Sequence, residues 1–436
     1  MPQPNFIDKL TAALTTAGRE ALDALTRTAR ARSLALYAVG GSVRDLLLER
    51  PTLDLDLTLE GDAPALARTV ATGLTDVRCT IHPTFRTATL KGAGIRIDVA
   101  SARAETYQRP GALPSIHQGS LRDDLFRRDF TANALALALT GDRAGDLIDP
   151  FHGAADLEAG LLRTLHEASF RDDATRILRG ARYETRLGFR FEPQTLRWLR
   201  RDVRYLETIS GPRLRDELLR VLREPQPERI LMRLHELGAL TVLHPSLSFD
   251  KRRASAFARL RELREEPPAT ACLALLAWGL TSPEAAALAA RLSLTRREAE
   301  ALRAAPEART LLPALSADVP PSRVVELLSP LPAAAVWALA AAAGAPAGER
   351  AVRYLRHWRY ARPLLDGRTL MAMGAPPGPR LGEVLRRLKA AKLDGEVRTR
   401  RDEETMARRL LGLASGPATP RRVRLRPDSR TRGPHP

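Results

Sequence analysis

Two aspartates, Asp54 and Asp56, stand on either side of one residue in a stretch where leucines alternate with polar side chains. The alternation has the period of a β-strand, so the leucines of Leu53–Leu59 share one face and both carboxylates share the other. Two neighbouring carboxylates repel each other unless a cation lies between them. Such a pair is often only a solvated strand face, so its chemistry depends on the elements around it.

The element before this strand supplies a second feature. Leu34–Val39 reads as a short apolar strand, Gly40 and Gly41 interrupt it, and a short helix opens at Ser42 and must end near Pro51. A strand, a turn and a helix N-terminus offer backbone N–H groups that suit a phosphate. A glycine pair after a strand is commonly just a turn, but its occurrence before a carboxylate pair favours metal-assisted nucleotide chemistry.

A third carboxylate lies further along the chain. Strands are expected at Val77–Ile81, Thr87–Leu90 and Ile95–Val99, with a hairpin turn at Gly92–Gly94 joining the last two. Asp98 is on the polar face of the last strand. It can join the aspartate pair if the two strands are neighbours, although a strand aspartate is equally often solvated.

The segment 102–124 has weak periodicity and reads as a loop, and a helix is expected over 125–139. The adjacent Arg127 and Arg128 suit phosphate groups. In a helix, Asp129 and Asn133 would be one turn apart and could act together on a ribose. The alternative is an ordinary amphipathic helix with a solvated polar face.

A later helix is predicted over 170–188, opened by Ser169 and Asp172 as a capping box and ended by Gly188. The polar side chains of this helix recur every three residues and form a ridge along it. Considered alone, the ridge favours a ladder of salt bridges, but its side chains could instead recognise the base of a nucleotide. A carboxylate accepts the amino hydrogen of cytosine or adenine while an arginine donates to the ring nitrogen, and uracil and guanine are rejected. The ridge consists of Asp173, Arg176, Arg179 and Arg182.

The composition sets wider bounds. The net charge of +18 comes largely from arginine and favours a polyanionic partner such as a nucleic acid, unless it reflects only a compositional bias. Two cysteines, Cys79 and Cys272, are too few for a disulfide framework. The sequence predicts no signal peptide and no membrane span, and hence a cytoplasmic protein. Beyond 149–153 it is almost entirely helical, with proline-rich joints near 310–320.

The motifs in chain order are LYAVGGSVRD, LDLDL, RIDVASARAETY, RRDFTANALAL, LIDPFHGAADL, FRDDATRILRGARYETRLGF and SGPRLRDELL. This set, over roughly residues 34–222, resembles the class II tRNA nucleotidyltransferases and bacterial poly(A) polymerases of the polymerase-beta-like superfamily. The resemblance implies an α/β nucleotidyltransferase head with a mixed sheet, followed by all-α neck, body and tail domains. The expected divisions are a catalytic head over 1–140, a neck with the base-reading helix over 141–225, a body over 226–315, a tRNA-binding tail over 316–414 and a basic disordered terminus over 415–436.

The resemblance also implies roles for particular residues. Asp54 and Asp56 match the family's metal-binding catalytic aspartates, and Asp98 remains the candidate third catalytic carboxylate. Asp173 and Arg176 match the pair that reads the base, which reverses the preference for a ladder. Where the family usually has glutamate, this chain has Asp172. The nucleotide contacts implied are Gly40, Gly41, Arg44, Arg128, Asp129, Asn133, Asp173, Arg176, Arg179 and Arg182.

The implied activity is the addition of CCA, or of its terminal A, to tRNA 3′ ends from CTP and ATP. It would proceed by two-metal transfer with Mg²⁺ as the cofactor and release of pyrophosphate. A CC-adding enzyme would have a shortened segment where 102–124 looks full length. A poly(A) polymerase and an inactive RNA-binding protein remain alternatives. The sequence leaves open which addition occurs, the oligomeric state, the tRNA contacts of the tail and the role of the basic terminus.

Overall fold

A mixed seven-stranded sheet forms the first part of the chain in the computed structural model, which describes residues 6–51, 54–92 and 94–413. The strand order is β3-β4-β5-β2-β1-β8-β9, and within this sheet β2 and β5 pair in parallel while the other described pairs are antiparallel. The predicted strands and the pairing of β4 with β5 are confirmed. The strands are β1 (Leu36–Val39), β2 (Leu55–Leu59), β3 (Val77–His82), β4 (Thr87–Gly92), β5 (Ile95–Ser101), β8 (Ala136–Ala138) and β9 (Leu147–Ile148).

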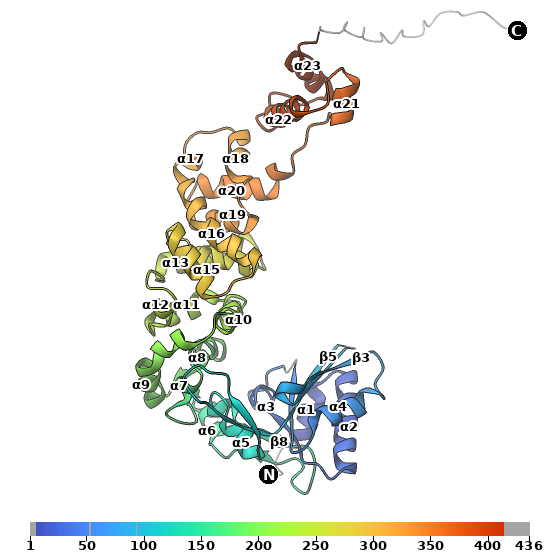
Figure 1. Cartoon of the computed structure of the whole chain (residues 1–436), viewed down its shortest axis with the longest axis vertical. Coiled ribbons are helices and arrows are strands. Elements are labelled where there is room, and N and C mark those ends of the chain that lie inside the picture. The colour runs from blue at the N-terminus through green and yellow to red at the C-terminus, as the bar shows by residue number, and fades with distance from the viewer. Residues whose placement is uncertain (1–5, 52–53, 93, 414–436) are drawn as a thin grey trace, which may run out of the picture. The chain divides into compact units, whose positions relative to one another are not determined.

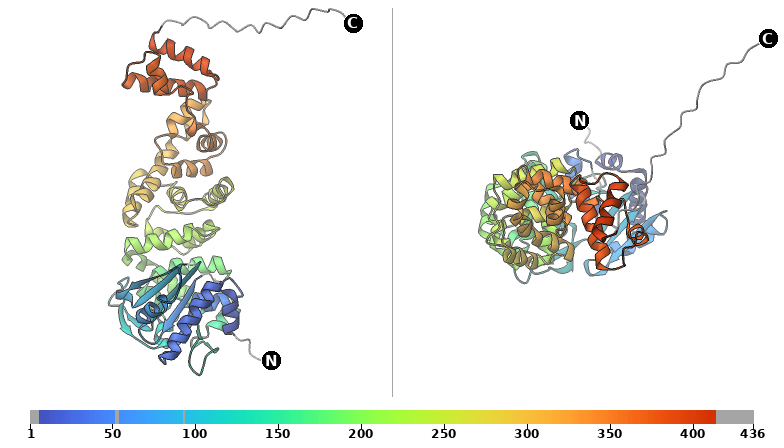
Figure 2. Two further views of the ribbon diagram at one scale, coloured as in Figure 1. Left: turned by 90° about the vertical axis from the view of Figure 1, so that its right-hand side faces the viewer. Right: turned by 90° about the horizontal axis from the view of Figure 1, so that it is seen from above.

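Helices cover one face of this sheet. Helices α2 (Thr16–Ala31) and α4 (Ala63–Ala71) lie side by side and pack on β5, as Figures 1 and 2 show. The leucines of β2 are buried in the same core, as their alternation predicts. The N-terminal segment forms two helices, because α1 (Phe6–Ala13) ends and the Thr15 side chain caps the start of α2.

The segment predicted as a loop and the helix predicted after it are both different in the structure. Residues 102–124 contain an antiparallel hairpin, β6 (Arg103–Thr106) and β7 (Ser115–Gln118), followed by the start of α5 (Leu121–Phe126). The predicted helix over 125–139 is wrong: α5 ends, a 3₁₀ turn η2 (Thr131–Asn133) follows, and the chain enters β8. Every residue of β8 is buried, so the strand lacks the alternation that would have revealed it.

The predicted helix over 170–188 is also two elements. Helix α7 (Ser169–Asp172) ends, Asp173 adopts an extended conformation, and α8 (Thr175–Leu187) begins. The predicted capping box is wrong, because the Asp173 carboxylate accepts the Thr175 N–H instead and the Ser169 hydroxyl accepts from Arg176. Gly188 ends α8 with φ of 75°, as predicted.

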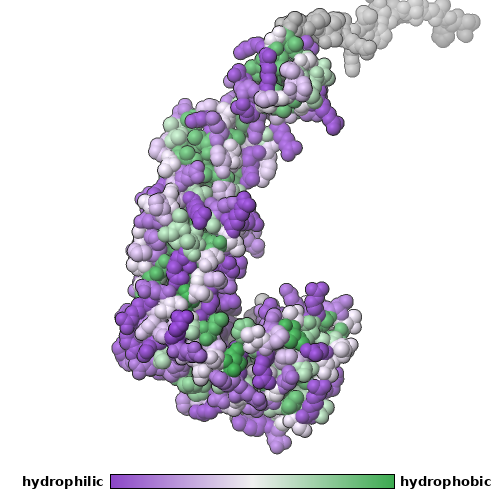
Figure 3. All heavy atoms as spheres, in the orientation of Figure 1, coloured by the Kyte–Doolittle hydropathy of each residue, from purple (hydrophilic) through white to green (hydrophobic). Residues whose placement is uncertain are grey.

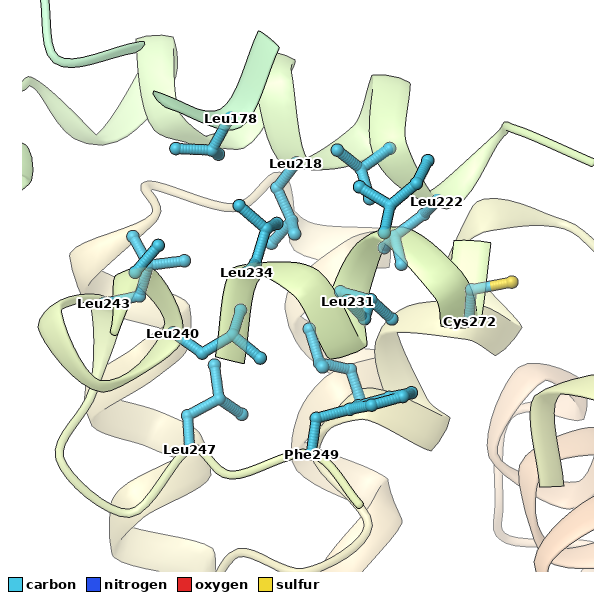
Figure 4. Close-up of a cluster of buried hydrophobic side chains, with 14 of the residues drawn as sticks. Leu178, Leu218, Leu222, Leu231, Leu234, Leu240, Leu243, Leu247, Phe249 and Cys272 are labelled. Atoms are coloured by element: carbon cyan, nitrogen blue, oxygen red, sulfur yellow. The ribbon is translucent and has the colours of Figure 1, made fainter. Parts of the chain in front are cut away.

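The helical part that follows is built around a continuous apolar core. Figure 4 shows Leu178 of α8, Leu218 of α10 and Leu234 of α11 pointing toward one another within it. The elements here are α6 (Gly153–Glu158), β10 (Leu161–Leu162), β11 (Arg190–Phe191), α9 (Pro193–Asp202), η3 (Val203–Thr208), α10 (Gly211–Leu222), α11 (Pro227–Glu236), α12 (Ala239–Leu243), α13 (Lys251–Leu263), α14 (Ala269–Leu276), α15 (Ser282–Arg291), α16 (Arg296–Thr310) and α19 (Ala333–Ala342). Helix α3 (Gly41–Leu47) belongs to the sheet instead and packs on β1 and β2.

The chain divides into two compact units. The first spans 1–310 and 332–342, and the second spans 311–331 and 343–436. The second unit has its own small core around Leu370 and Leu388. The four predicted domains stay predictions, and the predicted basic terminus over 415–436 lies outside the described residues. The second unit's elements are α17 (Leu312–Ser316), α18 (Pro321–Leu328), α20 (Ala347–Arg356), η4 (Trp358–Tyr360), α21 (Gly367–Ala372), α22 (Pro379–Leu393) and α23 (Arg400–Leu411).

Hydrophilic residues are interspersed with apolar ones on the face of the molecule drawn in Figure 3. Among the residues that the structure describes, no helix is both long enough and apolar enough to cross a membrane.

Candidate active site

The carboxylates come together at the parallel pair of strands. Asp56 of β2 is in register with Asp98 of β5, which confirms that the two strands are neighbours. Asp54 is exposed and lies immediately before β2. The oxygens of Asp98 are already engaged: one accepts from the Thr89 hydroxyl, and the other lies 3.0 Å from Nε of Arg96. Among the described residues, no side chain is recorded as a hydrogen-bond partner of the carboxylate oxygens of Asp54 and Asp56, which leaves these oxygens as candidate metal ligands.

These two carboxylates fit a hard cation. Burial raises the pKa of Asp56; Arg128 opposes that shift, while the carboxylates of Asp98 and Asp54 add to it. A bound cation would relieve this repulsion. Within the described ranges, no cluster of three or more acidic, histidine or cysteine side chains could hold a metal by itself. Magnesium is commonly bound by one or two carboxylates plus substrate phosphates, so a pair is a sufficient protein contribution.

The glycine pair lies against an arginine instead of simply turning the chain. Gly40 has φ of 69°, and a Cβ there would lie 2.2 Å from Nη1 of Arg128. Gly41 opens α3, which carries Arg44 into the same region. The Arg44 guanidinium donates to Oδ1 of Asn133 at 2.7 Å and lies 5.3 Å from the ring centroid of Tyr183. Only glycine permits this close approach of backbone and guanidinium.

One buried carboxylate holds both adjacent arginines. Asp124, at the end of the segment predicted as a loop, is fully buried. It accepts from Arg127 at 2.7 and 3.0 Å and from Arg128 at 3.0 Å. Burial alone would raise the pKa of Asp124, but Arg128 and Arg127 outweigh it, so the pKa lies below its ordinary value. The sequence signal for this role was only its spacing of three and four residues from the arginines.

Asp129 and Asn133 touch even though the predicted helix is absent. The Asn133 amide donates to Oδ1 of Asp129 at 2.8 Å, because the 3₁₀ turn η2 brings the two residues together. Oδ2 of Asp129 forms an ion pair of 2.6 Å with Arg179 of α8. Burial would raise the pKa of Asp129, but Arg179 and the Asn133 hydrogen bond lower it. The ion pair ties α8 to the segment between α5 and η2.

The polar ridge of α8 is not a ladder along its own helix. Arg176 is 4% exposed; it donates to the Ser169 hydroxyl at 2.5 Å and to the Arg127 carbonyl at 2.7 Å. Arg182 pairs with Glu224 at 3.2 Å. The ridge arginines therefore pair with groups from other elements, and Asp173 pairs with none of them.

Most of the predicted nucleotide contacts line one cavity of about 300 Å³. Its walls also contain a hydrogen-bonded pair that the sequence pattern did not reveal: the Tyr107 hydroxyl donates to the Glu105 carboxylate at 2.9 Å. They belong to the hairpin segment, where weak periodicity hid them. Gly40, Asp54 and Asp98 lie outside the lining. The lining is Gly41, Arg44, Asp56, Glu105, Tyr107, Arg127, Arg128, Asp129, Asn133, Asp173, Arg176, Arg179, Arg182, Tyr183 and Arg186.

The cavity is rich in guanidiniums and has the Asp56 carboxylate in its wall. Among the described residues, two buried donor atoms of its lining, Nε of Arg128 and Nε of Arg182, have no hydrogen-bond partner, and the buried Oδ2 of Asp129 has only its ion pair with Arg179. Buried donors without partners are uncommon and concentrate at functional sites. Guanidiniums suit phosphate oxygens, and carboxylates suit a divalent cation. Together with the mixed sheet, this arrangement defines the class of the protein as a nucleotidyltransferase.

Comparison with known proteins identifies the family. Residues 36–163 match the poly A polymerase head domain, and residues 188–250 match the probable RNA and SrmB-binding site of polymerase A. The A-adding tRNA nucleotidyltransferase of Halalkalibacterium halodurans is 33% identical over 93% of this chain and 95% of its own length. The CC-adding tRNA nucleotidyltransferase of Deinococcus radiodurans is 35% identical over 86% and 90%. A third relative, the A-adding enzyme of Geobacter sulfurreducens, is 34% identical over 87% of this chain, which spans 46% of that protein's length.

Solved structures agree with these relatives. A CCA-adding enzyme in its apo form II superposes with a TM-score of 0.79 at 31% identity, over 92% of this chain and 97% of that one. The Thermotoga maritima CCA-adding enzyme complexed with tRNA gives a TM-score of 0.76 at 30% identity, over 94% and 98%. The chain therefore belongs to the tRNA nucleotidyltransferase family, and the predicted fold class is confirmed.

Proposed function

We propose that this protein adds CCA, or the terminal A of that sequence, to the 3′ end of tRNA from CTP and ATP and releases pyrophosphate. The observation that supports this proposal most is that one cavity is lined by Asp56, by several guanidiniums and by both Asp173 and Arg176. Structures of CCA-adding enzymes in complex with ATP and with CTP resemble this chain at TM-scores of 0.77 and 0.76. These nucleotides and tRNA fit the cytoplasmic location that the sequence predicts.

The protein's own residues would position the reactants. Arg128 and Arg44 are oriented by Asp124 and Asn133, so they present fixed positive charge to a triphosphate. Asp54 and Asp56 would hold Mg²⁺ together with the substrate phosphates. When bound, the metal would supply the Lewis acidity that activates the 3′-hydroxyl and stabilises the departing pyrophosphate. The role of Asp98 is to set the charge at this edge, because it raises the pKa of Asp56 while its own oxygens are engaged.

Base choice is assigned to Asp173 and Arg176. The Arg176 guanidinium is fixed by Ser169 and by the Arg127 carbonyl, and it keeps further N–H donors for a ring nitrogen. An aspartate oxygen can accept the amino group of adenine or cytosine. Guanine and uracil would place a carbonyl oxygen against the carboxylate, which is repulsive and leaves both groups unpaired.

The second unit is proposed to bind tRNA. It has a cavity of about 670 Å³ whose lining includes Arg359, Arg362, Arg386 and Lys389. Tyr360 is exposed beside them, with the Arg359 guanidinium 5.2 Å from its ring centroid. Cationic side chains around an exposed aromatic ring suit a sugar–phosphate backbone with an accessible base or ribose. The helical neck and body over 141–225 and 226–315 would connect this tail to the catalytic head.

The test is a nucleotide-addition assay with Mg²⁺. Labelled tRNAs ending before CCA, after the first C and after CC are supplied with ATP, CTP or both, beside an unrelated RNA. Three additions to the shortest tRNA establish a CCA-adding enzyme, and one A on the CC-ended tRNA alone establishes an A-adding enzyme. Two C residues alone would establish the CC-adding alternative, and A tracts on every RNA a poly(A) polymerase. No extension and no pyrophosphate would refute the enzyme assignment.

The same assay tests the metal assignment. Asp54→Ala and Asp56→Ala should each abolish addition while tRNA binding survives, because the guanidiniums stay in place. Asp142→Ala removes an exposed carboxylate and serves as the matched control. Full activity in either active-site variant would contradict the proposed roles.

A further inference from the structure

The base-reading carboxylate is held by groups outside its own motif. Oδ1 of Asp173 forms an ion pair of 2.8 Å with Nη2 of Arg213, at the start of α10. The same oxygen accepts from the backbone N–H of Thr175 at 3.0 Å and from its hydroxyl at 2.7 Å. All three partners therefore converge on one oxygen of the carboxylate.

The other oxygen of Asp173 is left for a ligand. No hydrogen bond from a described residue reaches Oδ2, and the side chain forms part of the cavity wall. A carboxylate whose Oδ1 is fixed by three donors cannot freely rotate to exchange its two oxygens. The arrangement presents a single acceptor in a defined direction, as a group that must distinguish an amino donor from a carbonyl acceptor should.

Arg213 is itself fixed from the opposite side. Its Nη1 donates to the carbonyl of Gly111 at 3.3 Å, in the turn between β6 and β7. Gly111 has φ of 73°, and a Cβ there would lie 2.2 Å from the hydroxyl oxygen of Thr208 in η3. The turn is thus packed against η3 and places its carbonyl where Arg213 can reach it. Two amino groups of one planar guanidinium join the hairpin turn to Asp173.

We propose that Arg213 is a specificity-determining positioning residue that orients Oδ2 of Asp173 toward the base of the incoming nucleotide. This inference rests on the proposed function, because it assumes that Asp173 reads the base. Lysine could neutralise Asp173, but its ammonium lacks the planar fork that spans Gly111 and Asp173 together. The orientation therefore depends on the guanidinium geometry as well as on its charge.

The test compares nucleotide choice on a tRNA that ends in CC. Single-turnover kcat/KM is measured for ATP and GTP with wild type, Arg213→Ala and Arg213→Lys. We expect the ratio of ATP to GTP to fall by about tenfold in Arg213→Ala, the equivalent of one oriented charge-assisted hydrogen bond. The ratio for Arg213→Lys should lie between the ratios of wild type and Arg213→Ala. Arg215→Ala, an arginine on the same helix whose carboxylate partner is Asp216, should keep the wild-type ratio.

The ratio separates specificity from general damage, since a merely structural defect lowers both rates together. If Arg213→Ala folds poorly, Thr175→Val removes another Oδ1 donor and should lower the same ratio. Unchanged ratios in folded Arg213→Ala, or in Thr175→Val where the first variant does not fold, overturn the inference while the proposed function stands. A wild-type protein that adds no nucleotide to any tRNA overturns both.

Discussion

Asp124 should be the residue whose loss damages the nucleotide site most without touching a substrate. Its fully buried carboxylate accepts from two guanidinium groups and from the Thr58 hydroxyl. Removing one member of a buried ion pair costs about 3–5 kcal/mol because the partner is left uncompensated. Arg127 and Arg128 keep 18% and 16% of their side chains exposed, so water can hydrate them in part. We therefore expect Asp124→Ala to lower the free energy of unfolding by the lower end of this range, about 3 kcal/mol.

A loss of about 3 kcal/mol should lower the melting temperature of a large unit by roughly 6 °C. Differential scanning calorimetry measures this shift, and titration with ATP should show binding weakened by about tenfold once Arg128 is no longer oriented. The control is Asp146→Ala, which breaks an ion pair with Arg143 whose side chains are 52% and 66% exposed. That exposed pair should cost at most about 1 kcal/mol. Equal melting temperatures for the two variants would refute the reasoning.

Three further predictions follow from the same site. Gly40→Ala should lower the free energy of unfolding by about 1–2 kcal/mol, because the new Cβ strains a backbone with positive φ. The same Cβ displaces Arg128 and should raise the KM for ATP, so an unchanged KM would contradict the prediction. Asp173→Ala combined with Arg176→Ala should relax base choice, measured as UTP and GTP incorporation, and retained discrimination would exclude the pair as the reader. Burial and the charge of Arg176 lower the pKa of His166 from its usual 6.5 to about 4. As the pH drops from 6.5 to 4, the imidazole is protonated in the unfolded chain before it is protonated in the folded one, so the free energy of unfolding falls over this range. His166→Gln should remove at most about 3 kcal/mol of that acid sensitivity in urea unfolding measured from pH 7 to pH 4, and an unchanged slope would refute it.

Local patterns in the sequence determined the elements that have clear periods. The alternation around Asp56 predicted β2, and the hairpin turn predicted the pairing of β4 with β5. The same reasoning placed Asp98 beside Asp56 on the condition that their strands are neighbours, which the parallel register satisfies. Gly188 ended its helix as expected, because a residue in the left-handed region stops an α-helix locally.

The tertiary structure decided what local patterns could not. Strand β8 is buried on both faces between β1 and β9, so its sequence carries no alternation and reads as a helix. The Asp173 carboxylate is fixed in part by an ion pair with Arg213, which lies far away in the chain. Asp124 acquired its role only when burial made its carboxylate the counter-charge of two arginines. The sequence by itself therefore determined which chemical groups and which periodic elements the protein has. Long-range burial and ion pairing decided how those groups are oriented, because such interactions join residues whose separation in sequence has no fixed relation to their distance in space.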